Sequence, residues 1–302
     1  MSEEPQLRKA AGQTVALACQ AMGTRFELVL TGDDARSLRA AGEAALEEVT
    51  RWHNLLSAFD PASVVSRLNR EAAERPVSVP TEVAELLRWC ADMSQATAGA
   101  FNPAVGHLMR QAGFRDGPRA SCPAASSFAE SVHVDANRVR FTVPVALDFG
   151  AIGKGWALDR AAETLREAGV TDALLHGGTS SVITIGGPWR IALGAGDAVT
   201  LTDDALGVSA PSGRTVTDAQ GVRHGHILDP RTGCSALTAG AAVTGPSAAT
   251  CDAWSTALVV DPTLADALAW PTGYIAYLGI SSTPSTCSPP STPSSLLQGT
   301  SP

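Results

Sequence analysis

The chain has 302 residues, of which 44% are hydrophobic, and a formal net charge of −8 at pH 7. This length accommodates one large domain or two small ones, and the acidic balance argues against general nucleic-acid binding. No stretch of about 18 apolar residues predicts a membrane span, and the N-terminus lacks the apolar core of a signal peptide. The six scattered cysteines form no CxxC pair, which argues against a zinc site or a disulfide framework. We therefore expect a cytoplasmic protein with reduced thiols.

The first third of the chain predicts one strand followed by helices. Thr24–Leu30 alternates like a half-buried strand. A long helix is expected from Asp33 to about Leu56, because apolar residues recur every three to four positions after an acidic pair suited to a helix start. A short helix over 63–69 and a longer one over Thr81–Ala98, with Thr81 as its N-cap, should follow.

The next stretch predicts loops and strands around a single prominent helix. Gly99–Gly106 indicates a loop that either contacts a flat ligand or is explained by turn chemistry alone. Arg110–Phe128 indicates a surface loop, and residues 131–141 a β-hairpin. Strands are expected on both sides of the turn HGGTSS within residues 173–185, and again within 186–194. This order favours an α+β fold over a regular βα alternation.

The segment ALDFGAIGKGWALDR carries the main candidate site. A strand over Val145–Phe149 contains Asp148, and a loop with Gly150, Gly153, Gly155 and Lys154 should lead into a helix that ends at Gly169. Free N–H groups at the helix start, together with Lys154, would form an anion cradle, with Asp148 facing a nucleotide or a metal. Neither the Walker A nor the GxGxxG spacing is present, and tight packing of a strand against a helix explains the glycines equally well.

Two further candidates lie nearer the C-terminus. His226 in GHILDPRTG is suited to proton transfer near neutral pH, although a lone histidine is more often structural. Asp252 and Thr256 are four residues apart, hence on one face of a helix, and offer oxygen ligands for Mg²⁺ or Ca²⁺. An N-cap role for Asp252 and a packing role for Thr256 are equally open. Residues 281–302 lack charge and predict a disordered Ser/Thr/Pro-rich tail after a domain over 15–280.

Six segments in this order resemble the ApbE family, the FAD:protein FMN transferases. They are AMGTRFELVL, LSAFDPASVVSRLNR, GAFNPAVG, LDFGAIGKGWALDR, HILDPRTG and CDAWSTAL, and they span roughly residues 20–280. The resemblance implies an α+β fold of two lobes, with mainly antiparallel sheets, flanking helices and FAD in the cleft between the lobes. It also implies Mg²⁺-dependent transfer of FMN from FAD to a threonine or serine hydroxyl of an acceptor protein, with release of AMP.

The resemblance further implies roles for individual residues. The implied FAD contacts are Met22, Phe59, Ala100, Phe101, Asn102, Asp148, Lys154 and Leu228. The implied metal ligands are Ala151 (through its carbonyl), Asp252, Ser255 and Thr256. His226 matches the histidine that activates the acceptor hydroxyl, and Lys154 and Asp252 join it as catalytic residues. The chain departs from the family at Asn102, where Asp is common, and at HGGTSS (176–181), where GGD or GGN is more usual.

Two functional hypotheses of different classes follow. The first is the transferase, and the second is a flavin-binding protein that holds FAD, or hydrolyses it slowly, without a protein acceptor. The presence of a candidate base together with a candidate metal pair favours the enzyme, because a simple binder requires neither. A structural or interaction protein would rest on the tail alone.

Overall fold

Seven antiparallel strands form the main sheet of the protein. The structure is a computed structural model that describes residues 12–115, 127–194, 197–211, 215–217, 223–236, 239–266 and 270–280. The sheet has the order β1-β2-β6-β7-β10-β13-β14, and each neighbouring pair is antiparallel. Its strands are β1 Gln13–Ala21, β2 Thr24–Gly32, β6 Ala173–Gly177, β7 Ser181–Ile185, β10 Ala205–Ser209, β13 Gly240–Gly245 and β14 Ile275–Ile280.

Smaller sheets flank the main one. A three-stranded sheet has the order β3-β5-β4, from β3 Val77–Ser78, β4 Val132–Asp135 and β5 Arg138–Phe141. Two hairpins complete the strands: β8 Trp189–Gly194 with β9 Asp197–Leu201, and β11 Thr215–Thr217 with β12 Arg223–Gly225.

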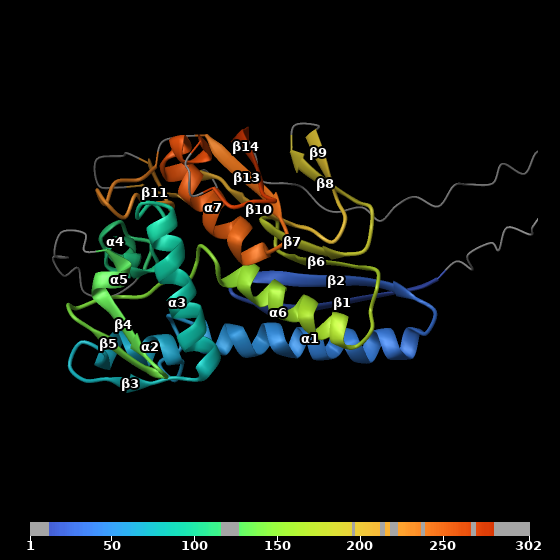
Figure 1. The fold of residues 1–302 in the computed structure, drawn as a ribbon, viewed down its shortest axis with the longest axis horizontal. Coiled ribbons are helices and arrows are strands. Elements are labelled where there is room, and N and C mark those ends of the chain that lie inside the picture. The colour runs from blue at the N-terminus through green and yellow to red at the C-terminus, as the bar shows by residue number, and fades with distance from the viewer. Residues whose placement is uncertain are drawn as a thin grey trace, which may run out of the picture.

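Helices cover one face of the main sheet and build a second lobe (Figure 1). The helices are α1 Ala35–Leu56, α2 Val64–Glu71, α3 Thr81–Ala96, α4 Gly106–Gln111, α5 Phe128–Ser131, α6 Gly153–Glu167 and α7 Ala248–Val260, with 3-10 turns at Pro103–Val105 and Pro262–Asp266. α1, α6 and α7 lie side by side on the main sheet, whereas α3 and α5 pack with the three-stranded sheet. The β8–β9 hairpin covers the other face through an apolar cluster that includes Leu174, Trp189 and Leu206.

This architecture confirms the α+β fold with antiparallel sheets and flanking helices. The long helix, the short helix, the 131–141 hairpin and the strands around HGGTSS form as predicted. The domain limits 15–280 stay a prediction, and the tail over 281–302 lies outside the described residues. Among the helices that the structure describes, none has the length and apolar character needed to cross a membrane.

Three local features of the structure differ from the sequence-based expectations. Strand β1 was not expected, because it is an edge strand in which only Val15 and Ala21 are buried and the apolar alternation is weak. Pro80, not Thr81, precedes the first turn of α3, and the Thr81 hydroxyl instead accepts a hydrogen bond from the Asn137 amide at 2.8 Å. Of the surface loop expected over 110–128, residues 110–111 belong to the end of α4 and residue 128 begins α5, while residues 116–126 lie outside the described part of the chain.

Residues 145–149 are extended but form no strand. Their backbone groups find partners outside a sheet: Asn69 accepts from the Leu147 N–H at 2.7 Å and donates to the Leu147 carbonyl at 3.1 Å. The Asp148 N–H donates to the Pro103 carbonyl at 2.8 Å. These bonds replace the ladder of a neighbouring strand, so the apolar run that predicted a strand is buried in an irregular segment.

Helices α6 and α7 touch through their backbones at Gly155. A Cβ at Gly155 would lie 2.4 Å from the Ala248 carbonyl oxygen, a distance that no side chain tolerates. Beside this contact, Asp159 of α6 accepts hydrogen bonds from the backbone N–H groups of Ala248 and Ala249, at 2.8 and 3.0 Å, and from the Ser247 hydroxyl at 2.8 Å. The glycine therefore permits the close helix crossing, in agreement with the packing interpretation of this glycine.

We predict that Gly155→Ala destabilises the protein by about 1–3 kcal/mol, because the added methyl group overpacks the crossing. Gly153→Ala is the matched control in the same helix, since its Cβ would lie 3.5 Å from the Met22 sulfur, an ordinary contact. The control should be neutral or gain up to about 1 kcal/mol from helix propensity. Urea titration of both variants measures the difference, and equal stabilities would contradict the crossing geometry.

Candidate active site

Asp252 is the buried centre of the candidate site. Its side chain is 4% exposed and lies in the second turn of α7, so the N-cap interpretation is wrong, because Ser247 is the N-cap. The carboxylate accepts hydrogen bonds from the Gly155 N–H at 2.9 Å and from the Ser181 hydroxyl at 2.8 and 2.9 Å. Burial raises the pKa of Asp252 to about 6, against the opposing effects of the Lys154 charge and these two hydrogen bonds.

Three hydroxyl groups are linked to one another and, through Ser255, to the backbone of Asp252. The Ser255 hydroxyl donates to the Asp252 carbonyl at 3.1 Å, and the Ser209 hydroxyl of β10 lies 2.9 Å from that of Ser255 and 3.1 Å from that of Thr256. Together with the carboxylate they form a set of oxygen donors, the ligand type that Mg²⁺ prefers. No group of three or more His, Cys, Asp or Glu side chains suited to a metal occurs in the described ranges.

The anion cradle predicted from the sequence falls on the first turn of α6 and stays a prediction. The helix begins at Gly153, so Lys154 lies in the helix and not in the preceding loop as predicted. Ile152, the residue before the helix, provides no side-chain cap. The Gly153 and Trp156 N–H groups donate to the Phe149 and Ile152 carbonyls, at 2.7 and 2.9 Å, and the Gly155 N–H donates to Asp252. Within the described residues, the Lys154 N–H is the one left for a ligand, and the Lys154 side chain is close enough to lower the pKa of the Asp252 carboxyl.

Asp148 has a partner that the sequence did not reveal. Its Oδ2 accepts a hydrogen bond from Arg115 Nε at 2.8 Å, and its Oδ1 accepts from the Gly150 N–H at 2.8 Å. The Arg115 guanidinium also lies over the Phe59 ring, 4.7 Å from its centre, and Phe59 is 71% exposed. Arg115 thus joins two of the expected FAD contacts, in a segment that was predicted as a surface loop.

His226 is half-buried and lies next to the same segment. Its ring meets the Phe114 ring edge to face, with 6.4 Å between the ring centres. Phe114 also packs in a small apolar cluster with Met109 and Leu228. The candidate base and the Asp148–Phe59 group are therefore connected by two consecutive residues, Phe114 and Arg115.

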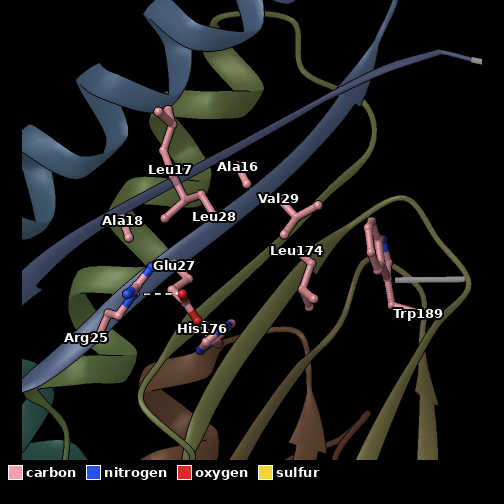
Figure 2. A pocket seen from close by; sticks show the side chains of 10 residues that line it. All are labelled: Ala16, Leu17, Ala18, Arg25, Glu27, Leu28, Val29, Leu174, His176 and Trp189. Atoms are coloured by element: carbon pink, nitrogen blue, oxygen red, sulfur yellow. Dashed lines mark ion pairs between the residues drawn. The ribbon is translucent and has the colours of Figure 1, made fainter. Parts of the chain in front are cut away.

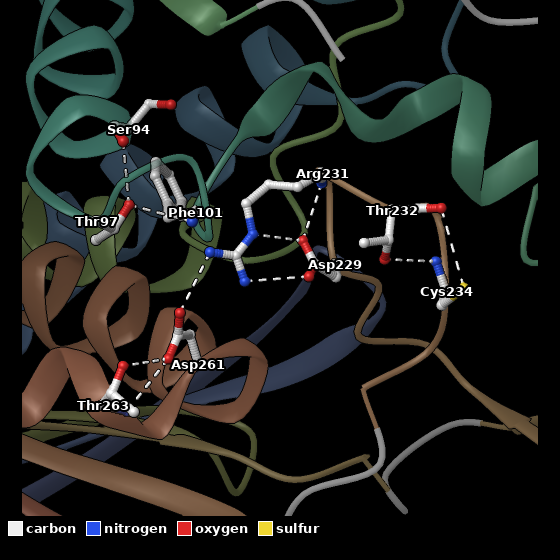
Figure 3. Close-up of polar contacts among 9 residues, drawn as sticks. All are labelled: Ser94, Thr97, Phe101, Asp229, Arg231, Thr232, Cys234, Asp261 and Thr263. Carbon is white, nitrogen blue, oxygen red and sulfur yellow. Dashed lines mark hydrogen bonds and ion pairs between the residues drawn. The ribbon is translucent and has the colours of Figure 1, made fainter. Parts of the chain in front are cut away.

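The turn after His226 is fixed to two other segments by Arg231 (Figure 3). Its guanidinium donates to both carboxylate oxygens of Asp229, at 3.0 and 3.1 Å, and to Asp261 at the end of α7, at 3.2 Å. The aliphatic part of Arg231 lies against Gly99, because a Cβ at Gly99 would be 3.8 Å from the Arg231 Cγ. The loop that precedes Ala100 and the helix that carries Asp252 therefore meet at this arginine.

Four other expected FAD contacts come from separate segments of the chain. Met22 has a left-handed backbone (φ 51°), and its N–H donates to His53 Nδ1 at 3.1 Å. Ala100 and Phe101 are each 1% exposed, so a ligand would meet their backbone and not their side chains. Asn102 caps the turn Pro103–Val105 by accepting from the Ala104 N–H at 2.8 Å.

The sequence therefore identified the motifs, but it did not reveal four residues that hydrogen-bond to them. Arg115, Asp159, Ser181 and Ser209 all bond to expected site residues or to the helix that carries them. For Ser181 a signal existed, since it is the last residue of HGGTSS, the turn that departs from the family pattern. For the other three, the sequence around them carries no separate signal.

A hollow of about 220 Å³ lies away from this site, on the outer face of the main sheet (Figure 2). Arg25, Glu27 and His176 gather at one end of it, and Val29, Leu174 and Trp189 line the other end. Glu27 pairs with Arg25 Nε at 2.7 Å and with His176 Nε2 at 3.0 Å, so the charges at its polar end are paired within the protein. None of the expected FAD or metal contacts lines this hollow.

Comparisons with known proteins all point to one family. A profile of the ApbE family matches residues 22–274. The chain is 33% identical to the FAD:protein FMN transferase of Rhodobacter capsulatus over 235 residues, which are 70% of this chain and 44% of that protein, so it spans less than half of that relative. It is 26% identical to the FAD:protein FMN transferase of Vibrio cholerae, over 73% of each.

Solved structures resemble the fold as a whole. The crystal structure of the ApbE protein from Thermotoga maritima has a TM-score of 0.74 and 29% identity, and the comparison covers 82% of this chain and 87% of that one. The flavinyl transferase ApbE from Pseudomonas stutzeri, in its apo form, has a TM-score of 0.70 and 25% identity, over 84% and 86%.

We predict that the Asp252 carboxyl makes stability depend on pH with a definite sign. Because its folded pKa of about 6 is raised above the ordinary 3.8, its contribution is fully present below pH 3.8 and is lost as the pH rises through 6. In EDTA, the free energy of unfolding of the wild type should fall by about 2 kcal/mol relative to Asp252→Asn between pH 4 and 7.

Asp34→Asn is a control of opposite sign, because hydrogen bonds from Ser37 and Arg36 lower the pKa of Asp34 at the start of α1. Its contribution is present at neutral pH and is lost as the pH falls. Urea titrations at a series of pH values measure both differences, and a pH-independent difference for Asp252→Asn would contradict the buried carboxylate.

Proposed function

The chain belongs to the ApbE family, and we propose that it is an FAD:protein FMN transferase that acts on a threonine or serine hydroxyl of an acceptor protein. The hydroxyl oxygen forms a bond to the phosphorus of the FMN half of FAD, the bond from that phosphorus to the AMP phosphate breaks, and AMP leaves. The observation that carries this proposal is Asp252, a buried carboxylate bonded to the first turn of α6, beside Lys154 and three hydroxyls.

We propose that FAD binds across the loops that surround the start of α6. The expected contacts come from separate segments and are Met22, Phe59, Ala100, Phe101, Asn102, Asp148, Lys154 and Leu228. Phe59 offers an exposed ring, and the N-terminus of α6 offers the Lys154 N–H and a positive dipole end for a phosphate. Lys154 adds a charge at the same end of the helix. These groups orient the diphosphate toward α7.

The oxygen donors near Asp252 fit a Mg²⁺ ion. Asp252, Ser255, Thr256 and the carbonyl of Ala151 would hold it, since Oδ1 of Asp252 has Ser181 as its one donor and retains a lone pair, while Oδ2 accepts from Gly155 and Ser181. A bound Mg²⁺ would neutralise charge that develops on the phosphoryl oxygens. The buried carboxylate, whose pKa burial raises, would be stabilised in its ionised form by such a cation.

We propose His226 as the base that accepts the proton of the acceptor hydroxyl. Hydroxyl groups are poor nucleophiles unless a base takes their proton, and histidine titrates in the required range. The edge of Phe114 orients the ring, and the Arg231 contacts fix the turn that follows it.

We also propose that the reaction takes place in the cytoplasm. Four cysteines of the described residues are free thiols, as expected for a reducing compartment: Cys19, Cys90, Cys234 and Cys251.

The test is the release of AMP. Purified protein with FAD and Mg²⁺ should release AMP and form covalent FMN on a threonine-containing acceptor peptide only when that peptide is supplied. Release at the same rate without peptide would make the chain a pyrophosphatase, and FAD binding without release would make it a flavin-binding protein.

We predict that Asp252→Ala abolishes transfer and its dependence on a divalent cation, because the variant lacks the only carboxylate of the proposed metal ligands. The wild type should lose activity in EDTA and regain it with Mg²⁺, and its melting temperature should rise with Mg²⁺ only when Asp252 is present. Full activity of the variant in excess EDTA would reject the assignment.

We predict that His226→Ala lowers the rate of transfer by about 10²–10⁴-fold, the usual contribution of a general base. FAD binding should be unchanged, because other groups make those contacts. His224→Ala is the matched control two residues away, and the double variant shows whether His224 substitutes for His226. Flavin fluorescence measures binding, and mass spectrometry of the acceptor measures transfer. A loss of FAD affinity in step with the rate would show that His226 only shapes its turn.

A further inference from the structure

Arg115 lies between two expected FAD contacts, although no motif marks it. Its Nε donates to the buried Asp148 at 2.8 Å, and its guanidinium lies 4.7 Å from the centre of the exposed Phe59 ring. The Arg115 side chain is only 15% exposed, so its position is held from two sides. An arginine that both stacks on a ring and pairs with a carboxylate is fixed in orientation more firmly than a surface arginine.

The other end of the guanidinium faces the loop before α6. A Cβ at Gly150 would lie 3.8 Å from Arg115 Nη2, so this nitrogen lies over a residue that is exposed and has no side chain. Three residues further on, the first turn of α6 begins with Gly153 and Lys154. Arg115 therefore places a second cationic side chain, besides Lys154, near the loop that leads into α6.

We propose that Arg115 is a further FAD-binding residue, whose guanidinium binds the diphosphate of the dinucleotide. This inference rests on the proposed function and adds a residue to it. The Nε atom donates to Asp148, while among the described residues Nη1 has only a long contact of 3.5 Å to the Phe114 carbonyl. The Nη groups thus retain the donors that match phosphate oxygens in pairs. In a chain of net charge −8, a diphosphate needs such local positive groups.

The competing account is that Arg115 only neutralises the buried Asp148. The two accounts differ in which ligands depend on the arginine. FAD and ADP carry the diphosphate, whereas riboflavin carries the flavin ring without any phosphate. A diphosphate contact weakens the first two ligands when it is removed, while a purely structural role changes all ligands alike.

The experiment measures the binding of FAD, riboflavin and ADP to Arg115→Met in EDTA, by flavin fluorescence and calorimetry. We expect FAD and ADP to bind about 10- to 100-fold more weakly, the usual loss for a charge-assisted hydrogen bond, while riboflavin binding stays unchanged. Arg115→Lys should recover part of the loss, because lysine keeps the charge without the paired donors.

Arg51→Met is the matched control. Arg51 also lies over a ring, 5.1 Å from the centre of Trp52, and pairs with Glu48 and Glu82, but it contacts no expected FAD residue through these groups. The control should bind all three ligands like the wild type.

Equal weakening of riboflavin and FAD, or unchanged FAD and ADP binding, would overturn the proposal. If the wild type binds ADP through Arg115 but does not transfer FMN, the diphosphate site stands and the proposed function fails. The two inferences are therefore separable.

Discussion

Two aspartates join α6 and α7 at the centre of the structure, because each accepts hydrogen bonds at the start of the other helix. Asp159 of α6 accepts three hydrogen bonds at the N-terminus of α7, and Asp252 of α7 accepts one from the Gly155 N–H in the first turn of α6. The first N–H groups of a helix have no partner within it, and a carboxylate both satisfies them and complements the dipole. Each helix thus caps the start of the other, and the missing side chain at Gly155 lets them approach closely enough to do so.

These reciprocal hydrogen bonds also place two ionisable carboxyl groups in the buried contact between the two helices. Burial raises the pKa of both aspartates, so their ionised forms are costly unless the surrounding donors and cations offset the lost hydration. Around Asp159 the backbone and Ser247 supply the donors, and the carboxylate has a purely structural environment. Around Asp252 the hydrogen-bond donors are fewer, and the charge of Lys154 is near. This difference is why the proposed metal site is at Asp252 and not at Asp159. The same helix contact therefore supports the fold at one end and the candidate site at the other.

The parts of the fold that the sequence predicted are those where burial follows the period of the element. In α1, Leu38, Ala45, Val49, Trp52 and Leu56 are all buried along one stripe, and the helix was predicted from that spacing. The misses have the opposite character. β1 is held in the sheet by pairing with β2 along nine residues, and not by an apolar pattern of its own. Residues 145–149 have the composition of a buried strand, but Asn69, 78 residues away from Leu147, takes the place of a neighbouring strand.

The same reasoning explains how far the site could be predicted. Asp148, His226 and Asp252 lie in motifs, and the resemblance of those motifs to the ApbE family marks them in the amino-acid sequence itself. Their partners lie far away in sequence: Arg115 is 33 residues from Asp148, and Ser181 is 71 residues from Asp252. Such pairs exist only once the sheet and the helices have assembled, because no single segment contains both members. The first turn of α6 is where they meet, since it bonds to Asp252 through Gly155 and follows directly on Gly150, over which Arg115 lies. A ligand that binds at this turn would therefore contact groups held by the sheet, by α7 and by the loop after α4, and its binding would depend on the correct assembly of all three.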